Sequence, residues 1–129
     1  MNRVIPYKLK DWVEVDQLDC FALSTNPKAI DLLKCNHDKI NWTGLSLNEN
    51  AISILEKNID KLDWKHLSKN KNAIHLLEQH LDNIDWDSLS INPNAIHLLE
   101  QYPNKINWNT VWCNPSIFYE TKMNDYILK

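Results

Sequence analysis

The sequence predicts an all-α fold: a right-handed α-solenoid of 22-residue two-helix repeats, each with one long and one short helix, between degenerate caps. Three observations support this prediction. Asparagines recur every 22 residues, at Asn26, Asn48, Asn70, Asn92 and Asn114. Alanines and tryptophans recur at the same interval without an insertion, at Ala29, Ala51, Ala73 and Ala95 and at Trp42, Trp64, Trp86 and Trp108. Periods of about 20–50 residues are typical of stacked repeats, in which each unit covers the apolar face of its neighbour.

The unbroken register predicts one domain over all 129 residues. An N-terminal cap is expected at 1–25, where Trp12 covers the open face of the first repeat. The four repeats are placed at 26–47, 48–69, 70–91 and 92–113. A C-terminal cap is expected at 114–129, with a helix that ends near Met123.

Each repeat is expected to open with its long helix. Asn92 is a favoured N-cap residue, and Pro93 suits the first helical position, so the asparagines are interpreted as N-caps. Ile96, Leu98 and Leu99 then form an apolar face at helical spacing. These features predict a helix of about ten residues.

A short second helix is expected at each tryptophan. The residue before it is Asn41, Asp63, Asp85 or Asn107, all good N-cap residues. Trp and Leu three residues apart fit one face of a helix of about six residues, of α or 3₁₀ type. We expect the tryptophans to fill the core between successive units.

Composition excludes several classes of function. No apolar run approaches the ~20 residues of a membrane span, and the first residues lack the apolar core of a signal peptide, so we expect no membrane partner and a cytoplasmic location. The net charge of −3 comes from interspersed charges and gives no general reason to bind an anionic polymer. The three cysteines fit no zinc-ligand spacing and are expected to be free thiols.

One repeat position varies strongly, and it forms the candidate partner-binding surface: Asp31, Ser53, His75 and His97. A position that accepts three such different side chains is expected to face solvent. The two histidines lie one repeat apart with no third ligand column beside them, so we expect no metal site.

The repeated glutamates Glu56, Glu78 and Glu100 are spaced by whole repeats rather than paired, and are interpreted as a solvated helix face. No cysteine–histidine pair has an orienting partner. We therefore expect no catalytic residues, no cofactor and no enzyme activity.

The leading hypothesis is a non-enzymatic protein-interaction module or scaffold that presents variable surface columns to a protein partner. One alternative is a structural, self-associating protein, such as a virion component, that uses apolar turn residues such as Ile59 and Leu81. Another is nucleic-acid binding through the asparagines and tryptophans. This alternative lacks a basic column for the phosphates, because Asn83 interrupts the row of Lys39, Lys61 and Lys105.

The segments Asn92 to Glu100 and Lys39 to Ser46 carry the pattern Asn-Pro-x-Ala-Ile-x-Leu-Leu-Glu and Lys-Ile-x-Trp-x-x-Leu-Ser. This pattern resembles the short tandem repeats of uncharacterised proteins from giant nucleocytoplasmic DNA viruses of protists. The resemblance covers nearly the whole chain. It implies a viral origin and a helical repeat fold, with a place in the host cytoplasm or the virion, and it implies no biochemical activity. Cys20 at a Trp position, and Glu49 and Lys71 at the Pro position, depart from the pattern.

Overall fold

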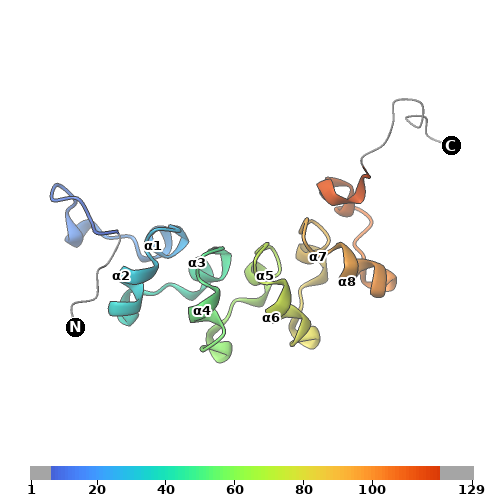
Figure 1. Ribbon diagram of the computed structural model, residues 1–129, viewed down its shortest axis with the longest axis horizontal. Helices are drawn as coiled ribbons and strands as arrows, with labels where there is room; N and C mark the ends of the chain where they lie inside the picture. The colour runs from blue at the N-terminus through green and yellow to red at the C-terminus, as the bar shows by residue number, and fades with distance from the viewer. Residues whose placement is uncertain (1–6, 120–129) are drawn as a thin grey trace.

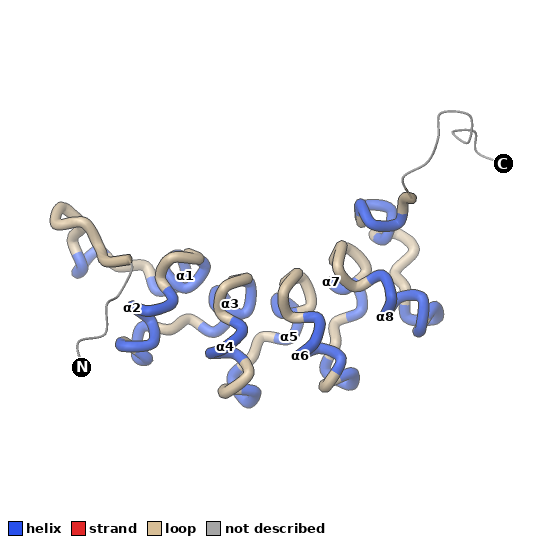
Figure 2. The backbone as a smooth tube through the Cα atoms, viewed as in Figure 1, coloured by secondary structure: helices blue, strands red, loops and turns tan. Residues whose placement is uncertain are grey.

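The computed structural model describes residues 7–119, and this part of the chain is all helical, without a β-strand. Short α-helices alternate with 3₁₀ turns and irregular connections (Figures 1 and 2). The α-helices are α1 (Cys20–Thr25), α2 (Ile30–Cys35), α3 (Trp42–Leu47), α4 (Ile52–Leu55), α5 (Trp64–Leu67), α6 (Ile74–Glu78), α7 (Trp86–Leu89) and α8 (Ile96–Gln101). The all-α prediction is confirmed.

The helices form one curved row with two edges (Figure 1). The odd-numbered helices lie along the concave edge, where α1 packs against α3 and α3 against α5. The even-numbered helices lie along the convex edge, and α2, α6 and α8 each contact the 3₁₀ turn that follows them. These turns are His37–Lys39, Ile59–Lys61, Leu81–Asn83 and Pro103–Lys105. The first and last described segments lie at opposite ends of the row.

The predicted contrast between a long and a short helix is wrong, because both kinds of helix have only four to six residues. The even-numbered helices stop where the backbone leaves the helical region, as at Asn58 with φ −135° and ψ 49°. Asn58 also donates its side-chain amide to the Ile54 carbonyl at 2.8 Å, which satisfies one carbonyl of the last turn.

The interpretation of the recurring asparagines as N-caps is wrong for the α-helices, although Asn114 does cap the 3₁₀ turn Pro115–Ile117, where its side chain accepts the Ser116 N–H at 3.0 Å. α8 begins at Ile96, and its cap position is held by Ala95, which makes no side-chain cap bond. Asn92 lies one turn earlier, where its side-chain oxygen accepts the Asn94 N–H at 3.1 Å and its carbonyl accepts the Ala95 N–H. This tight turn replaces the expected first turn of the helix.

The second N-cap column is confirmed. The side chains of Asn41, Asp63 and Asp85 each accept a hydrogen bond from the backbone N–H three residues later, at 2.9–3.1 Å. Asp19 does the same for α1. Asn107 instead accepts the N–H two residues later, and no α-helix follows it within the residues described, up to 119, so the last unit departs from the others.

One contiguous apolar core runs along the row. The leucines Leu33, Leu45, Leu55, Leu67, Leu77 and Leu89 are fully buried. Ala29, Ala51, Ala73 and Ala95 are buried too, as a close approach between neighbouring backbones requires. The predicted leucine and alanine faces are therefore confirmed.

The tryptophans are less buried than predicted. Trp42, Trp64 and Trp86 are half-buried and pack against the edge of the core, while Trp108 is 62% exposed. Two of the rings are covered by residues 16 positions later, since Trp64 contacts His80 and Trp86 contacts Tyr102 at centroid distances of 5.4 Å. A tryptophan is too large to be enclosed between units whose backbones approach at alanine positions.

The asparagines connect successive units instead. Asn70 donates its side-chain amide to the carbonyls of Ser46 at 3.0 Å and Asn48 at 3.1 Å, and it is 2% exposed. The same pair of bonds is made at four successive asparagine positions, and we call these residues the clamp asparagines: Asn48, Asn70, Asn92 and Asn114. A second amide, from Asn50, Asn72 or Asn94, reaches the backbone carbonyl 23 residues earlier at 2.8–3.1 Å.

A serine column forms the other set of bonds between units. Ser46 donates its hydroxyl to the Trp42 carbonyl at 2.7 Å and accepts the backbone N–H of Asp63 at 3.1 Å. Ser68 and Ser90 repeat both bonds. Each neighbouring pair of units is thus joined by directed polar bonds as well as by apolar contacts, which fixes one register between them.

At the ends the pattern changes. Val15–Gln17 and α1 lie 22 residues before their counterparts His37–Lys39 and α3. Trp12, expected to cover the N-terminal face, is instead 78% exposed, beside a turn that replaces a helix. At the other end Phe118 occupies the position of Ile96 and has extended backbone. The helix predicted for the C-terminal cap therefore does not begin at this position. The predicted helix end near Met123 lies outside the described residues.

Candidate interaction surfaces

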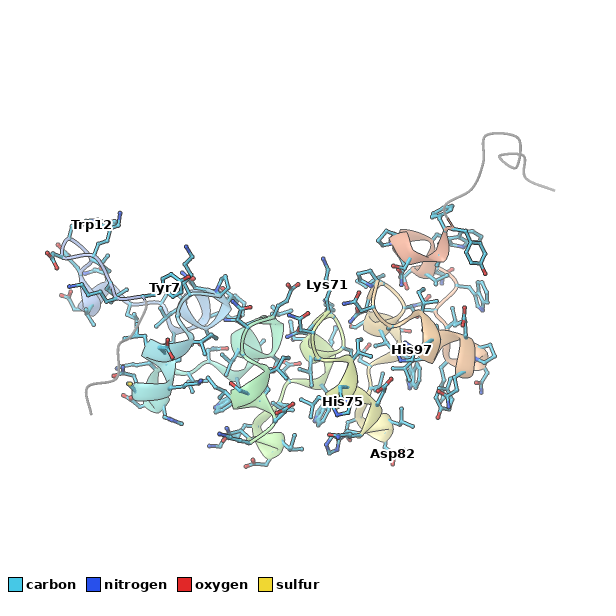
Figure 3. All side chains as sticks on the ribbon, in the orientation of Figure 1. Tyr7, Trp12, Lys71, His75, Asp82 and His97 are labelled. Carbon is cyan, nitrogen blue, oxygen red and sulfur yellow. The ribbon has the colours of Figure 1, made fainter. Side chains whose placement is uncertain are left out.

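The predicted partner-binding residues lie at one position of successive even-numbered helices. Ser53 on α4, His75 on α6 and His97 on α8 are exposed, whereas Asp31 on α2 is half-buried. The prediction that this position faces solvent is thus correct for three of the four residues. Figure 3 shows His75 and His97 on neighbouring helices, with Lys71 at the opposite edge of the row.

The two histidines are linked by Glu78, which the sequence analysis treated as merely solvated. Its Oε1 lies 2.5 Å from His97 Nε2, on the next helix of the row. Its Oε2 lies 3.9 Å from His75 Nδ1, one turn earlier on the same helix. Gln79 Nε2 also lies 3.4 Å from His75 Nε2. The position of the histidines and the position of Glu78 therefore form one polar surface, because Glu78 on α6 contacts His97 on α8.

A second polar cluster lies at the start of α5. Asp63 Oδ2 accepts the Thr43 hydroxyl at 3.1 Å and lies 2.9 Å from His66 Nδ1. Burial raises the pKa of the Asp63 carboxyl, but the hydrogen bonds from His66 and Thr43 outweigh this effect, and the pKa is lowered overall. Because Asp63 caps α5 and bonds to Thr43 on α3, the cluster holds these two helices together, and this structural role accounts for it.

The C-terminal end of the row carries an apolar groove of about 430 Å³. Its lining includes Ile96, Leu99, Val111 and Ile117, with Trp108, Trp112 and Tyr119. These three aromatic side chains are 62%, 68% and 91% exposed. Trp112 stands 22 residues after Ser90, at the position where the preceding repeats carry serine, and the sequence predicted no groove beside it.

A smaller hollow of about 210 Å³ lies at the N-terminal end, between residues 7–10 and the apolar residues Leu23 and Leu32. Lys28 Nζ lies 5.1 Å from the centroid of the Tyr7 ring there. Residues 7–10 thus cover part of the first unit's outer face. The turn residues Ile59 and Leu81, proposed above as a self-association surface, are instead half-buried against the core.

The side chains of residues 7–119 offer no arrangement of three or more His, Cys, Asp or Glu residues that could hold a metal ion. All three cysteines are free; Cys35 and Cys113 are exposed. None of the helices in the described range is long and apolar enough to cross a bilayer.

Comparisons with protein-family models, with curated proteins and with solved structures find no match.

Proposed function

We propose that the chain is a non-enzymatic protein-binding scaffold, built as a right-handed α-solenoid of 22-residue repeats. The supporting observation is the contrast between invariant connections and variable surface. The clamp asparagines make the same two bonds in four successive units, with donor–acceptor distances between 2.9 and 3.1 Å. The exposed position on the convex edge meanwhile changes from Ser53 to His75 and His97.

A surface of this kind favours binding by complementarity along the row. The polar bonds between units already fix the backbone, so the scaffold does not have to become ordered when a partner binds. The entropic cost of binding is therefore smaller than for a flexible chain. Glu78 holds His97 by a hydrogen bond and thus reduces the number of conformations that this side chain samples. The binding surface we propose consists of Ser53, His75, Glu78 and His97, flanked by Asp31.

The proposal also includes a viral origin and a place in the cytoplasm of a protist host or in the virion, because the repeats resemble those of giant-virus proteins. The test is therefore affinity capture from a protist lysate with two variants. One carries Ser53→Ala, His75→Ala and His97→Ala, and leaves the half-buried Asp31 unchanged. The control carries Lys57→Ala and Gln101→Ala, which are also exposed but occupy a different repeat position.

A protein retained by the wild type and the control, and lost by the triple variant, is the expected result. The interaction should then be reproduced with the purified partner, with a dissociation constant raised at least tenfold by the triple change, about 1.4 kcal/mol. Equal retention by all three proteins would refute the proposed surface. Retention abolished by nuclease or by moderate salt would instead indicate nucleic-acid binding.

A further inference from the structure

The C-terminal end of the row exposes a cluster of aromatic side chains that the interior units do not. Trp108 and Trp112 are 62% and 68% exposed, and Phe118 and Tyr119 are 73% and 91% exposed. The interior tryptophans at the position of Trp108 are more buried, because residues of the next unit cover them, as Tyr102 covers Trp86. Three of these residues, Trp108, Trp112 and Tyr119, line one groove, and aromatic residues gathered in one exposed patch are typical of protein–protein interfaces.

This end carries both a hollow and protruding rings. The groove of about 430 Å³ is floored by Leu99 and Val111, which are nearly buried, while Trp108, Trp112 and Tyr119 stand at its rim. In a symmetric dimer the same face of both copies meets, so a side chain that protrudes from one copy must fit a hollow on the other, and the reverse contact follows by symmetry. Each face must therefore carry both a hollow and protruding side chains.

A second copy cannot continue the row in the existing register. The interior serine position has no room for a larger side chain, because Ser90 is fully buried and its hydroxyl accepts the Asn107 N–H at 2.9 Å. Trp112 occupies that position in the last unit and removes both the space and the acceptor. In addition, residues 7–10 lie over the N-terminal face of the first unit. A head-to-tail stack is therefore disfavoured at both ends.

We infer that this aromatic end is a homodimer interface, in which two copies meet through their C-terminal faces. About two thirds of Trp108 and Trp112 and nine tenths of Tyr119 are exposed, so the three side chains at the groove offer about 500 Å² per copy and about 1,000 Å² in total. That area reaches the roughly 1,000 Å² that a specific interface requires. This inference is independent of the convex surface proposed above, because none of its residues belongs to the aromatic end.

The test is the mass of the full chain measured by sedimentation and light scattering, from micromolar to millimolar concentration. The wild type is expected to reach twice its mass of 15.2 kDa and to grow no further. The variant Trp108→Ala/Trp112→Ala is expected to remain a monomer, since loss of one interface hot spot raises a dissociation constant about 30-fold. The matched control is Trp12→Ala, which removes an even more exposed tryptophan from the other end.

A second variant separates association from folding. Trp112→Ser installs the residue that three interior units carry, so the helical circular dichroism should be kept while dimerisation weakens. A third measurement identifies the face: with Cys20 and Cys35 changed to Ser, a short bis-maleimide should join the exposed Cys113 of one copy to that of the other. A wild type that stays monomeric at millimolar concentration, a mass that rises without limit, or equal dissociation by Trp12→Ala would each overturn the inference.

Discussion

Replacement of one clamp asparagine provides the sharpest test of how the units are held together. Asn70→Ala removes three hydrogen bonds: two donated to the carbonyls of Ser46 and Asn48, and one accepted from the Asn72 N–H at 3.0 Å. Each net hydrogen bond contributes about 0.5–1.5 kcal/mol, so the free energy of unfolding should fall by about 3 kcal/mol. The side chain is 2% exposed, so water cannot easily replace the lost partners.

Asn26→Ala is the matched control, because Asn26 occupies the same repeat position at the start of the row. It is exposed, and in the described part of the chain its side chain makes one bond, accepted from the Lys28 N–H at 3.0 Å. This change should cost about 1 kcal/mol. Urea denaturation followed by circular dichroism should therefore give midpoints that differ by about 1 M, for a slope of about 2 kcal/mol per molar. Equal midpoints for the two variants would show that the bonds from Asn70 to the preceding unit do not stabilise the fold. Both residues would then be simple turn caps.

Three further outcomes are expected. Gly44→Ala should lower the free energy of unfolding by about 1–3 kcal/mol, because the new Cβ would lie 2.8 Å from the Phe21 carbonyl oxygen. This cost outweighs the better helix propensity of alanine, and a raised urea midpoint would contradict the prediction. The lowered pKa of Asp63 means that its stabilising effect is present above the carboxyl's unfolded pKa of about 3.9 and is lost as pH falls through the folded value. An Asp63→Asn variant should therefore lose less stability between neutral pH and pH ~3 than the wild type, as measured by thermal melts at each pH. His75→Ala and His97→Ala should each change stability by no more than about 0.5 kcal/mol, and unfolding of either variant at room temperature would show that these side chains are not surface residues.

The sequence was sufficient to predict the class of fold and the buried faces. Period and residue type identify Leu45 and Ala51 as core because an apolar residue that recurs in every unit has few other roles. Asp63 and Asp85 were identified as caps because their side chains act within one turn, where local sequence determines geometry.

The sequence was insufficient where a side chain bonds across units. An asparagine before a helical pattern is explained locally by a cap, so the contacts of Asn70 with residues 22 and 24 positions earlier give no local signal. The same reason explains why Glu78 was not connected to His97. The groove beside Trp112 depends on how the last unit departs from its predecessors, which a periodic pattern cannot describe. The variable position was recognised because variation itself is visible in one sequence.

The polar bonds between units have a direction with a consequence for biosynthesis. In the asparagine and serine bonds the donor always belongs to the later residue, as when Asn92 donates to Ser68 and Asn70, or Asp85 to the Ser68 hydroxyl. A chain leaving the ribosome therefore exposes each set of acceptors before the donors that need them. Every newly emerged unit can donate its bonds at once to a unit already made, and only its own acceptors wait for the next unit. The row can thus assemble vectorially, with the nascent chain growing by one repeat at a time from its N-terminal end.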